Sequence, residues 1–240
     1  MTDAAQRPPD VPPTPIEVPQ PALTDGQRSQ LDALLDLLAS DIHAPTAVRE
    51  RASASQIHVS DSLAALELEA VREARLFADI GSGAGFPGLA LAVAMPSAEF
   101  VLLESQRRKC DFLVRARAAA SADNAAVLCA RAEDWREGLG SRDAVLARAV
   151  AAQPVVLEYA APLLRLGGHL VDWRGMRDRD DEEAADRAAR ELGLERADVR
   201  EVAPFPDARN RYLHVFAKVA ETPGRFPRRA GMAQKRPLGS

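Results

Sequence analysis

The segment with the strongest chemical signal combines one acid with several glycines. It runs from Asp79 to Gly88 and reads Asp-Ile-Gly-Ser-Gly-Ala-Gly-Phe-Pro-Gly. Glycine has no Cβ, so the backbone can turn sharply there and approach a ligand closely. The mainly apolar run 76–80, which overlaps the start of this segment, predicts a strand, and Pro87 is typical of the first turn of a helix. The segment therefore predicts a ligand-binding loop at the carboxyl end of a strand.

Two cofactors could fit this loop. From Gly83 it reads Gly-x-Gly-x-x-Gly, which is a weak match to the dinucleotide fingerprint. From Asp79 it reads acid-x-Gly-x-Gly-x-Gly, the pattern of S-adenosylmethionine sites. A carboxylate at the strand end would repel a pyrophosphate but would stabilise the positive charges of S-adenosylmethionine. Charge therefore favours S-adenosylmethionine, held at Asp79, Gly81, Gly83 and Gly85.

Two further acids follow the next predicted strands. Glu104 ends the strand at 99–104, where a carboxylate can accept the two ribose hydroxyls of such a cofactor. Ala132 and Glu133 follow the strand at 126–129 and are placed to flank an adenine. The structural alternatives are a solvated strand-end acid for Glu104 and a helix N-terminal acid for Glu133. We expect both acids to bind the cofactor.

Strands and helices alternate from residue 76 onward. Strands are expected at 76–80, 99–104, 126–129, 144–147, 168–173, 199–202 and 212–219, with helices between most of them. This order predicts an α/β fold with a doubly wound, mainly parallel, seven-stranded sheet. We expect a disordered Pro-rich segment at 1–22, a helical appendage at 23–75, a cofactor-binding domain at 76–220 and a basic tail at 221–240.

Composition narrows the class of protein. The 240 residues are 47% hydrophobic, with a net charge of −4 and no apolar run long enough to span a membrane. The N-terminus lacks a signal-peptide pattern, so we expect a cytoplasmic protein. Cys110 and Cys129 are expected to be buried free thiols. No cluster of His, Cys and Asp has metal-ligand spacing, so no metal is expected.

S-adenosylmethionine binding indicates a methyltransferase, and motifs that are absent from the sequence reduce the range of possible methyl acceptors. An aminomethyltransferase needs a polar-Pro-Pro-aromatic element after the fourth strand, where residues 145–150 read Val-Leu-Ala-Arg-Ala-Val. A cytosine-C5 enzyme needs a cysteine nucleophile near the same place, and neither cysteine lies there. An acceptor that is nucleophilic without deprotonation remains, and guanine N7 is one, because positioning and electrostatics can suffice for catalysis.

Four motifs together resemble a known family. They are the loop from Asp79 to Gly88, Arg148 in Ala-Arg-Ala, Trp173-Arg-Gly175, and an ending from Lys218 to Gly231 that contains Phe-Pro-Arg-Arg-Ala-Gly. Over about residues 30–238 the chain resembles the bacterial 16S ribosomal RNA guanine-N7 methyltransferases, also called glucose-inhibited division protein B.

The resemblance implies a Rossmann-like class I methyltransferase fold and methyl transfer from S-adenosylmethionine to guanine N7. It also implies 16S ribosomal RNA or the small ribosomal subunit as partner, and we expect a monomer. The implied cofactor contacts are Gly81, Phe86, Ala132, Glu133 and Arg148. A small-molecule methyltransferase, an NAD(P)-binding oxidoreductase and a non-catalytic RNA-binding module stay open as alternatives.

Several residues are expected on the substrate side. Arg148 ends the fourth strand and is the expected catalytic residue, which would orient the acceptor; we expect Arg148→Ala to cost little stability. His58, Asp61 and Arg174 are expected to line the site. The chain departs from the family with Ala44-Pro-Thr46 for Asn-Leu-Thr, Ile57 for Arg and Arg174 for Lys.

The tail from Glu221 has a net charge of +4 and is expected to contact phosphate through Arg228 and Arg229. Its removal should then leave cofactor affinity unchanged. The alternative is that Phe226 and Pro227 pin the tail onto the body as structure.

Overall fold

The computed structural model describes residues 16–18 and 21–239 of the chain. Most of the segment 1–22 therefore lies outside the described residues. Ile16–Glu17 form a short strand, β1, which pairs in parallel with β7 (Leu194–Ala203) through Ile16 and Val202. The expected disorder is wrong for these two residues, because the exposed edge of β7 gives them backbone partners.

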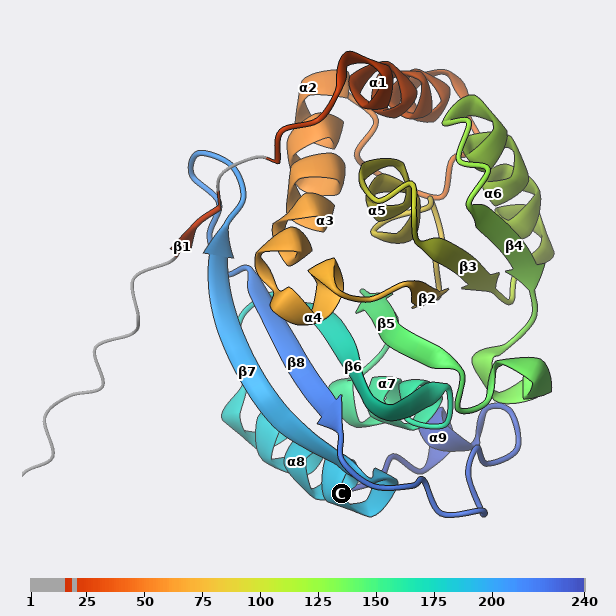
Figure 1. Cartoon of the computed structure of the whole chain (residues 1–240), viewed down its shortest axis with the longest axis vertical. Coiled ribbons are helices and arrows are strands. Elements are labelled where there is room, and N and C mark those ends of the chain that lie inside the picture. The colour runs from red at the N-terminus through yellow and green to blue at the C-terminus, as the bar shows by residue number, and fades with distance from the viewer. Residues whose placement is uncertain (1–15, 19–20, 240) are drawn as a thin grey trace, which may run out of the picture.

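The sheet has the order β1-β7-β8-β6-β5-β2-β3-β4 (Figure 1). The seven expected strands are confirmed, and β1 adds an eighth at the edge. Only β8 runs antiparallel to its neighbours, β6 and β7, among the strands that the structure describes. The remaining bounds are β2 Leu76–Ile80, β3 Glu99–Glu104, β4 Ala125–Cys129, β5 Arg142–Arg148, β6 Leu164–Arg174 and β8 Tyr212–Lys218.

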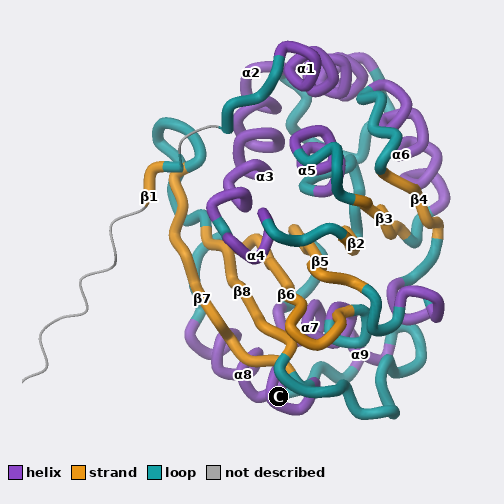
Figure 2. Tube along the Cα trace, viewed as in Figure 1, coloured by secondary structure: helices purple, strands orange, loops and turns teal. Residues whose placement is uncertain are grey.

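Helices cover both faces of this sheet (Figure 2). Alternate strand residues point to opposite faces, so Phe77 packs in one apolar cluster and its neighbour Ala78 in the other. The first cluster lies against α1 Asp25–Ser40, α3 Asp61–Leu63, α5 Gly88–Ala94 and α6 Arg107–Ala119. The second lies against α7 Gln153–Ala160, α8 Arg179–Leu192 and the short α9 Met232–Lys235.

The expected helical appendage packs on the first face. Thr24 is the N-cap of α1, since its hydroxyl accepts from the Gln27 amide at 3.2 Å and the Gln27 side chain accepts from the Thr24 amide at 2.9 Å. A second helical region of the appendage starts at Arg51. It consists of α2 Arg51–Ala54, a π-helical turn Ser55–Ser60, α3, a 3-10 turn and α4 Glu69–Arg72.

Candidate active site

The glycine loop follows β2 and adopts left-handed backbone angles. Gly81, Gly83 and Gly85 have φ values of +70°, +54° and +96°. A Cβ on Gly85 would lie 2.5 Å from Leu89 Cδ1, and the φ of +96° would strain any other residue, so the fold itself favours a glycine there. A Cβ on Gly83 would come no closer than 3.7 Å to its neighbours. The space at Gly83 is therefore free of protein atoms and open to a ligand.

Asp79 supports this loop from within. Its side chain is buried, and Oδ2 accepts a hydrogen bond of 3.0 Å from the amide of Gly88 at the start of α5. Burial raises the pKa of Asp79 to about 7, against the lowering effect of the Ser82 and Gly88 contacts. Asp79 lines none of the three cavities described below. Its observed role is to hold the loop on α5, whereas the sequence had suggested direct contact with the cofactor.

Three cavities adjoin at Ala149, directly after β5. The Glu104 cavity, of about 210 Å³, is lined by residues that include Gly81, Glu104, Gln106, Ala132, Glu133 and Gln234. The loop cavity, of about 350 Å³, is lined by residues that include Gly81, Gly83, Phe86, His58, Asp61 and Arg148. The arginine cavity, of about 230 Å³, is lined by residues that include Asp61, Arg148, Trp173, Arg174, Arg211 and Tyr212.

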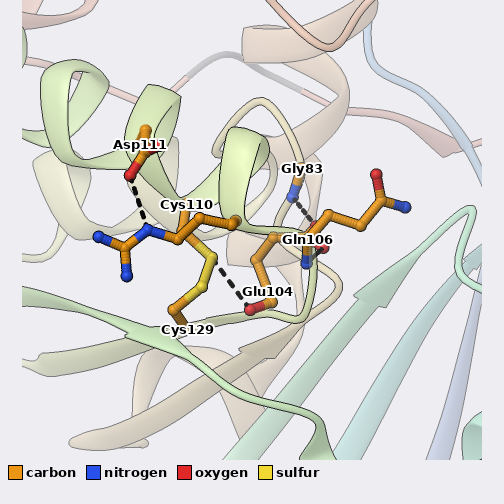
Figure 3. The surroundings of a disulfide bond; sticks show 7 residues. Gly83, Glu104, Gln106, Cys110, Asp111 and Cys129 are labelled. Atoms are coloured by element: carbon orange, nitrogen blue, oxygen red, sulfur yellow. Dashed lines mark hydrogen bonds and ion pairs between the residues drawn. A yellow bond between two sulfur atoms is a disulfide. The ribbon is translucent and has the colours of Figure 1, made fainter.

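Glu104 is fixed at the edge of the first cavity. Only 5% of it is exposed, and its two carboxylate oxygens accept from the amides of Gly83 at 3.2 Å and Gln106 at 2.9 Å (Figure 3). Each oxygen keeps a further lone pair, so the carboxylate can still accept from a ligand. A solvated strand-end acid is thereby excluded.

Glu133 lies in a 3-10 turn, Ala132–Asp134, rather than at a longer helix. It is buried, and its Oε1 accepts from the amide of Gly231 in the C-terminal tail at 3.2 Å. The expected adenine-flanking pair Ala132 and Glu133 therefore lines the Glu104 cavity together with a part of the chain that lies about a hundred residues later.

The two cysteines form a disulfide, so the expectation of free thiols is wrong (Figure 3). Cys110 lies in the first turns of α6, and Cys129 is the last residue of β4 and is exposed. Parallel pairing of β3 with β4 sets Cys129 opposite Glu104, and Cys110 Sγ lies 3.2 Å from the Glu104 carbonyl oxygen. The disulfide ties both elements together beside Glu104, and it removes one reason for expecting a cytoplasmic protein.

Arg148 lies where the sequence placed it, at the end of β5, and lines both the loop and the arginine cavities. Its Nη1 forms an ion pair of 3.1 Å with Asp61 Oδ2, and the side chains of Arg148 and Asp61 are 16% and 3% exposed. Nη1 also donates to the Ile57 carbonyl at 3.4 Å. Any residue at position 57 offers that carbonyl, so the family departure there leaves this contact intact.

His58 is held as a neutral ring. Its Nε2 lies 3.0 Å from the Thr46 hydroxyl, and the ring stacks on Phe86 at 5.0 Å between centroids. Burial, with a smaller effect from Arg148, lowers the pKa of His58 to about 4. His58 is therefore uncharged at neutral pH, and it connects the appendage to the glycine loop.

The arginine cavity is also lined by Arg211, a residue that was not predicted from the sequence. Arg174 donates from Nε to the buried Asp172 at 2.6 Å, while Arg211 Nε lies 3.9 Å from Asp61 Oδ1. Neither Asp61 Oδ1 nor Arg211 Nε has a hydrogen-bond partner among the described residues. Antiparallel pairing sets Arg174 opposite Tyr212, which follows Arg211, and nothing in the sequence revealed this pairing.

The C-terminal tail packs on the rest of the protein, which favours a structural role over contact with phosphate. Arg228 forms two contacts with the buried Glu158 of α7, one of them 2.6 Å from Nε to Oε1. Phe226 is buried, and Arg225 pairs with Glu191 at 2.9 Å. Arg228 is thus committed to an internal carboxylate, contrary to the expected phosphate contact, whereas Arg229 is exposed.

Within residues 16–18 and 21–239, no group of three or more His, Cys, Asp or Glu side chains could hold a metal ion. No helix in this part of the chain is both long and apolar enough to cross a membrane.

Solved structures share the fold. The chain matches the S-adenosylmethionine-dependent methyltransferase SibL in its apo form with a TM-score of 0.55 at 15% identity, over 82% of this chain and 70% of that one. It matches a W203A mutant of the 16S rRNA (adenine(1408)-N(1))-methyltransferase from Catenulisporales acidiphilia with a TM-score of 0.51 at 20% identity, over 64% and 89%. These likenesses show the α/β methyltransferase fold.

Sequence comparison adds the family. The chain is 42% identical over 187 residues to the ribosomal RNA small subunit methyltransferase G of Rubrobacter xylanophilus, covering 75% of this chain and 72% of the relative. It is 37% identical over 221 residues to the enzyme of the same name from Chloroflexus aggregans, covering 90% and 92%. The family model for rRNA small subunit methyltransferase G matches residues 28–207. The chain therefore belongs to the rRNA small subunit methyltransferase G family of S-adenosylmethionine-dependent enzymes.

Proposed function

We propose that this enzyme transfers a methyl group from S-adenosylmethionine to N7 of a guanine in 16S ribosomal RNA. The observation that carries the proposal is the position of Arg148, which lines both the loop cavity and the arginine cavity. One side chain thus reaches a cofactor site and a cationic site that adjoin each other. Family membership sets aside the oxidoreductase, small-molecule and non-catalytic alternatives.

The residues of the first two cavities fit the cofactor. Glu104 has carboxylate lone pairs left for ribose hydroxyls, and Ala132 and Glu133 lie beside it for the adenine. Gly83 leaves room for the aminoacyl part at the loop, next to Phe86. When bound, S-adenosylmethionine supplies a methyl group on a positively charged sulfur.

The arginine cavity suits an RNA nucleotide. Arg148, Arg174 and Arg211 can donate to phosphate oxygens or to the O6 edge of guanine. Guanine N7 already has a lone pair, so the protein needs no general base. Because positive charge develops on the purine during transfer, a bare arginine would oppose the reaction. Asp61 offsets the charge of Arg148, and its Oδ1 has no hydrogen-bond partner in the described structure.

Three finer features belong to the same proposal. RNA would enter on the side of His58, Asp61 and Arg174, with the exposed Arg229 as a phosphate contact at the tail. An enzyme that modifies ribosomal RNA would work in the cytoplasm. We also propose that it acts as a monomer.

Methyl transfer tests the acceptor side. Purified enzyme is incubated with labelled S-adenosylmethionine and either free 16S RNA or 30S subunits, and the modified nucleoside is identified after digestion. Arg148→Ala should lower the rate on the order of 10²-fold, because a positioning contact is lost. Arg148→Lys should not restore it, since an ammonium cannot reproduce the planar fork. Full activity in both variants would contradict the proposed role.

Ligand binding tests the cofactor side independently. Calorimetry should show binding of S-adenosylhomocysteine and none of NADH. Gly83→Val should abolish that binding, because the branched side chain would fill the open space at this position. The φ of +54° also strains a β-branched residue, so circular dichroism must first show that the variant is folded. Unchanged affinity in the folded variant would show that the cofactor lies elsewhere.

A further inference from the structure

The C-terminal tail reaches the cavity that we assign to the adenosine part of the cofactor. The last short helix, α9, contacts α7, and its Gln234 lines the Glu104 cavity beside Glu104, Ala132 and Glu133. Gln234 is exposed, as is Lys235, the next residue of the helix. Nothing in the sequence linked this part of the tail to the cofactor.

Two anchors hold α9 in this place. The first is the pair of Arg228 with Glu158, whose carboxylate is 1% exposed; the same guanidinium donates to the Arg236 carbonyl at 2.8 Å. The second is the 3.2 Å hydrogen bond from the amide of Gly231, directly before α9, to Glu133. Because Glu133 and Gln234 line one cavity, this bond couples the position of α9 to the shape of the cavity.

The buried side chains of the tail support a structural role. Phe226 is buried before the first anchor, and Ala233 is buried one residue before Gln234. A segment that only attracted RNA would not need buried apolar residues or internal partners for its arginines. The two paired arginines, Arg225 and Arg228, leave the tail with fewer free cations than its sequence suggested.

We propose that residues 226–234 form one wall of the adenosine site and that the carboxamide of Gln234 contacts the adenine base. A carboxamide has both a donor and an acceptor, which match the amino group and the adjacent ring nitrogen of adenine. This inference rests on the proposed cofactor site and adds to it a specificity residue. It reverses the expectation that removal of the tail leaves cofactor affinity unchanged.

The test compares two neighbouring alanine variants of α9. Gln234→Ala should weaken S-adenosylhomocysteine binding by roughly fivefold to tenfold in calorimetry, the effect of losing one or two hydrogen bonds. Lys235→Ala is the matched control, and it should bind as the wild type does. Equal affinity in wild type and Gln234→Ala would overturn the inference.

A ligand analogue isolates the base contact from general effects on the fold. S-inosylhomocysteine has an oxygen in place of the adenine amino group. The wild type should prefer S-adenosylhomocysteine over this analogue, and Gln234→Ala should lose most of that preference. A preference that is unchanged in Gln234→Ala would show that another group reads the base.

A second pair of variants tests the anchor. Arg228→Ala should weaken S-adenosylhomocysteine binding, whereas Arg225→Ala, which removes an exposed ion pair, should not. If Arg228→Ala is unstable, Arg228→Lys keeps a charge for Glu158 and should bind more weakly than the wild type because it lacks the fork. Wild-type affinity for S-adenosylhomocysteine in a folded Arg228 variant would show that the anchored tail does not form a wall of the adenosine site.

Gly83→Val separates this inference from the proposed cofactor site. If Gly83→Val abolishes binding while Gln234→Ala does not weaken it, the tail inference alone is wrong. If Gly83→Val binds normally, the site itself is wrong.

Discussion

Arg148→Ala should destabilise the protein as well as inactivate it. The variant leaves the carboxylate of Asp61, 3% exposed, without its main partner. Removing one member of a buried ion pair costs about 3–5 kcal/mol. Arg211 lies 3.9 Å away and continues to compensate part of the charge, so we expect the lower end, about 3 kcal/mol. This loss exceeds the small one expected from the sequence, which did not show that Arg148 has a buried partner.

Urea denaturation at pH 7 measures this loss directly. For a protein of this size, about 3 kcal/mol corresponds to a melting temperature lower by roughly 6–12 °C. The double variant Asp61→Asn/Arg148→Ala removes both charges, so it should recover much of the stability. It should stay inactive, because both groups at the junction of the loop and arginine cavities are lost.

The pH dependence gives a second check. Burial raises the pKa of Asp61, and the charge of Arg148 opposes that rise. Without Arg148 the pKa should rise further, so the folded variant binds a proton that the unfolded chain releases. The folded state then gains stability as pH falls, and the deficit of Arg148→Ala should shrink between pH 7 and pH 5. A variant with wild-type stability at pH 7, or a deficit that does not change with pH, would refute a buried pair.

Three further predictions follow from single contacts. Without reductant, Cys110→Ser should lower the free energy of unfolding by about 3 kcal/mol, because it opens a loop that spans 19 residues. Dithiothreitol should abolish the difference between the variant and the wild type. Two titratable thiols in the folded wild type would contradict the disulfide. Gly88→Ala should weaken both stability and S-adenosylhomocysteine binding, since its Cβ would lie 2.6 Å from Asp79 Oδ2, and a wild-type melting temperature would argue against this close approach. Burial lowers the pKa of His214 to about 4, so the unfolded chain binds a proton at a higher pH than the folded protein, and the wild type should lose stability as pH falls from 6.5 to 4. His214→Gln should lose about 2 kcal/mol less over this range. Parallel stability profiles of the two proteins would refute this prediction.

The sequence predicted the parts of the fold that depend on local patterns. The expected strands 76–80 and 99–104 match β2 and β3, because each is a mainly apolar run with a clear end, Gly81 after the first and Glu104 in the second. Glu104 was predicted as a site residue because it ends β3, and the carboxyl end of a parallel strand is where such sheets bind ligands. The loop glycines were found because few other roles require three of them at alternate positions.

The features that the sequence did not reveal all depend on contacts between distant segments. Cys110 and Cys129 meet because β4 pairs in parallel with β3, and spacing alone could not show this. Arg211 reaches the site because β8 is antiparallel to β6. The tail showed its charge but not its partners, and the buried Glu158 decides the orientation of Arg228. The sequence predicted a cofactor contact for Asp79, and its hydrogen bond from the Gly88 amide became visible only in the three-dimensional structure.

The most direct test of the central claim is the mapping of 7-methylguanosine in small-subunit ribosomal RNA from cells with and without this gene. One 7-methylguanosine should be present with the gene, absent without it and restored by the wild-type protein but not by Arg148→Ala. The same 7-methylguanosine pattern in both strains, or loss of a different methylated nucleotide, would contradict the account.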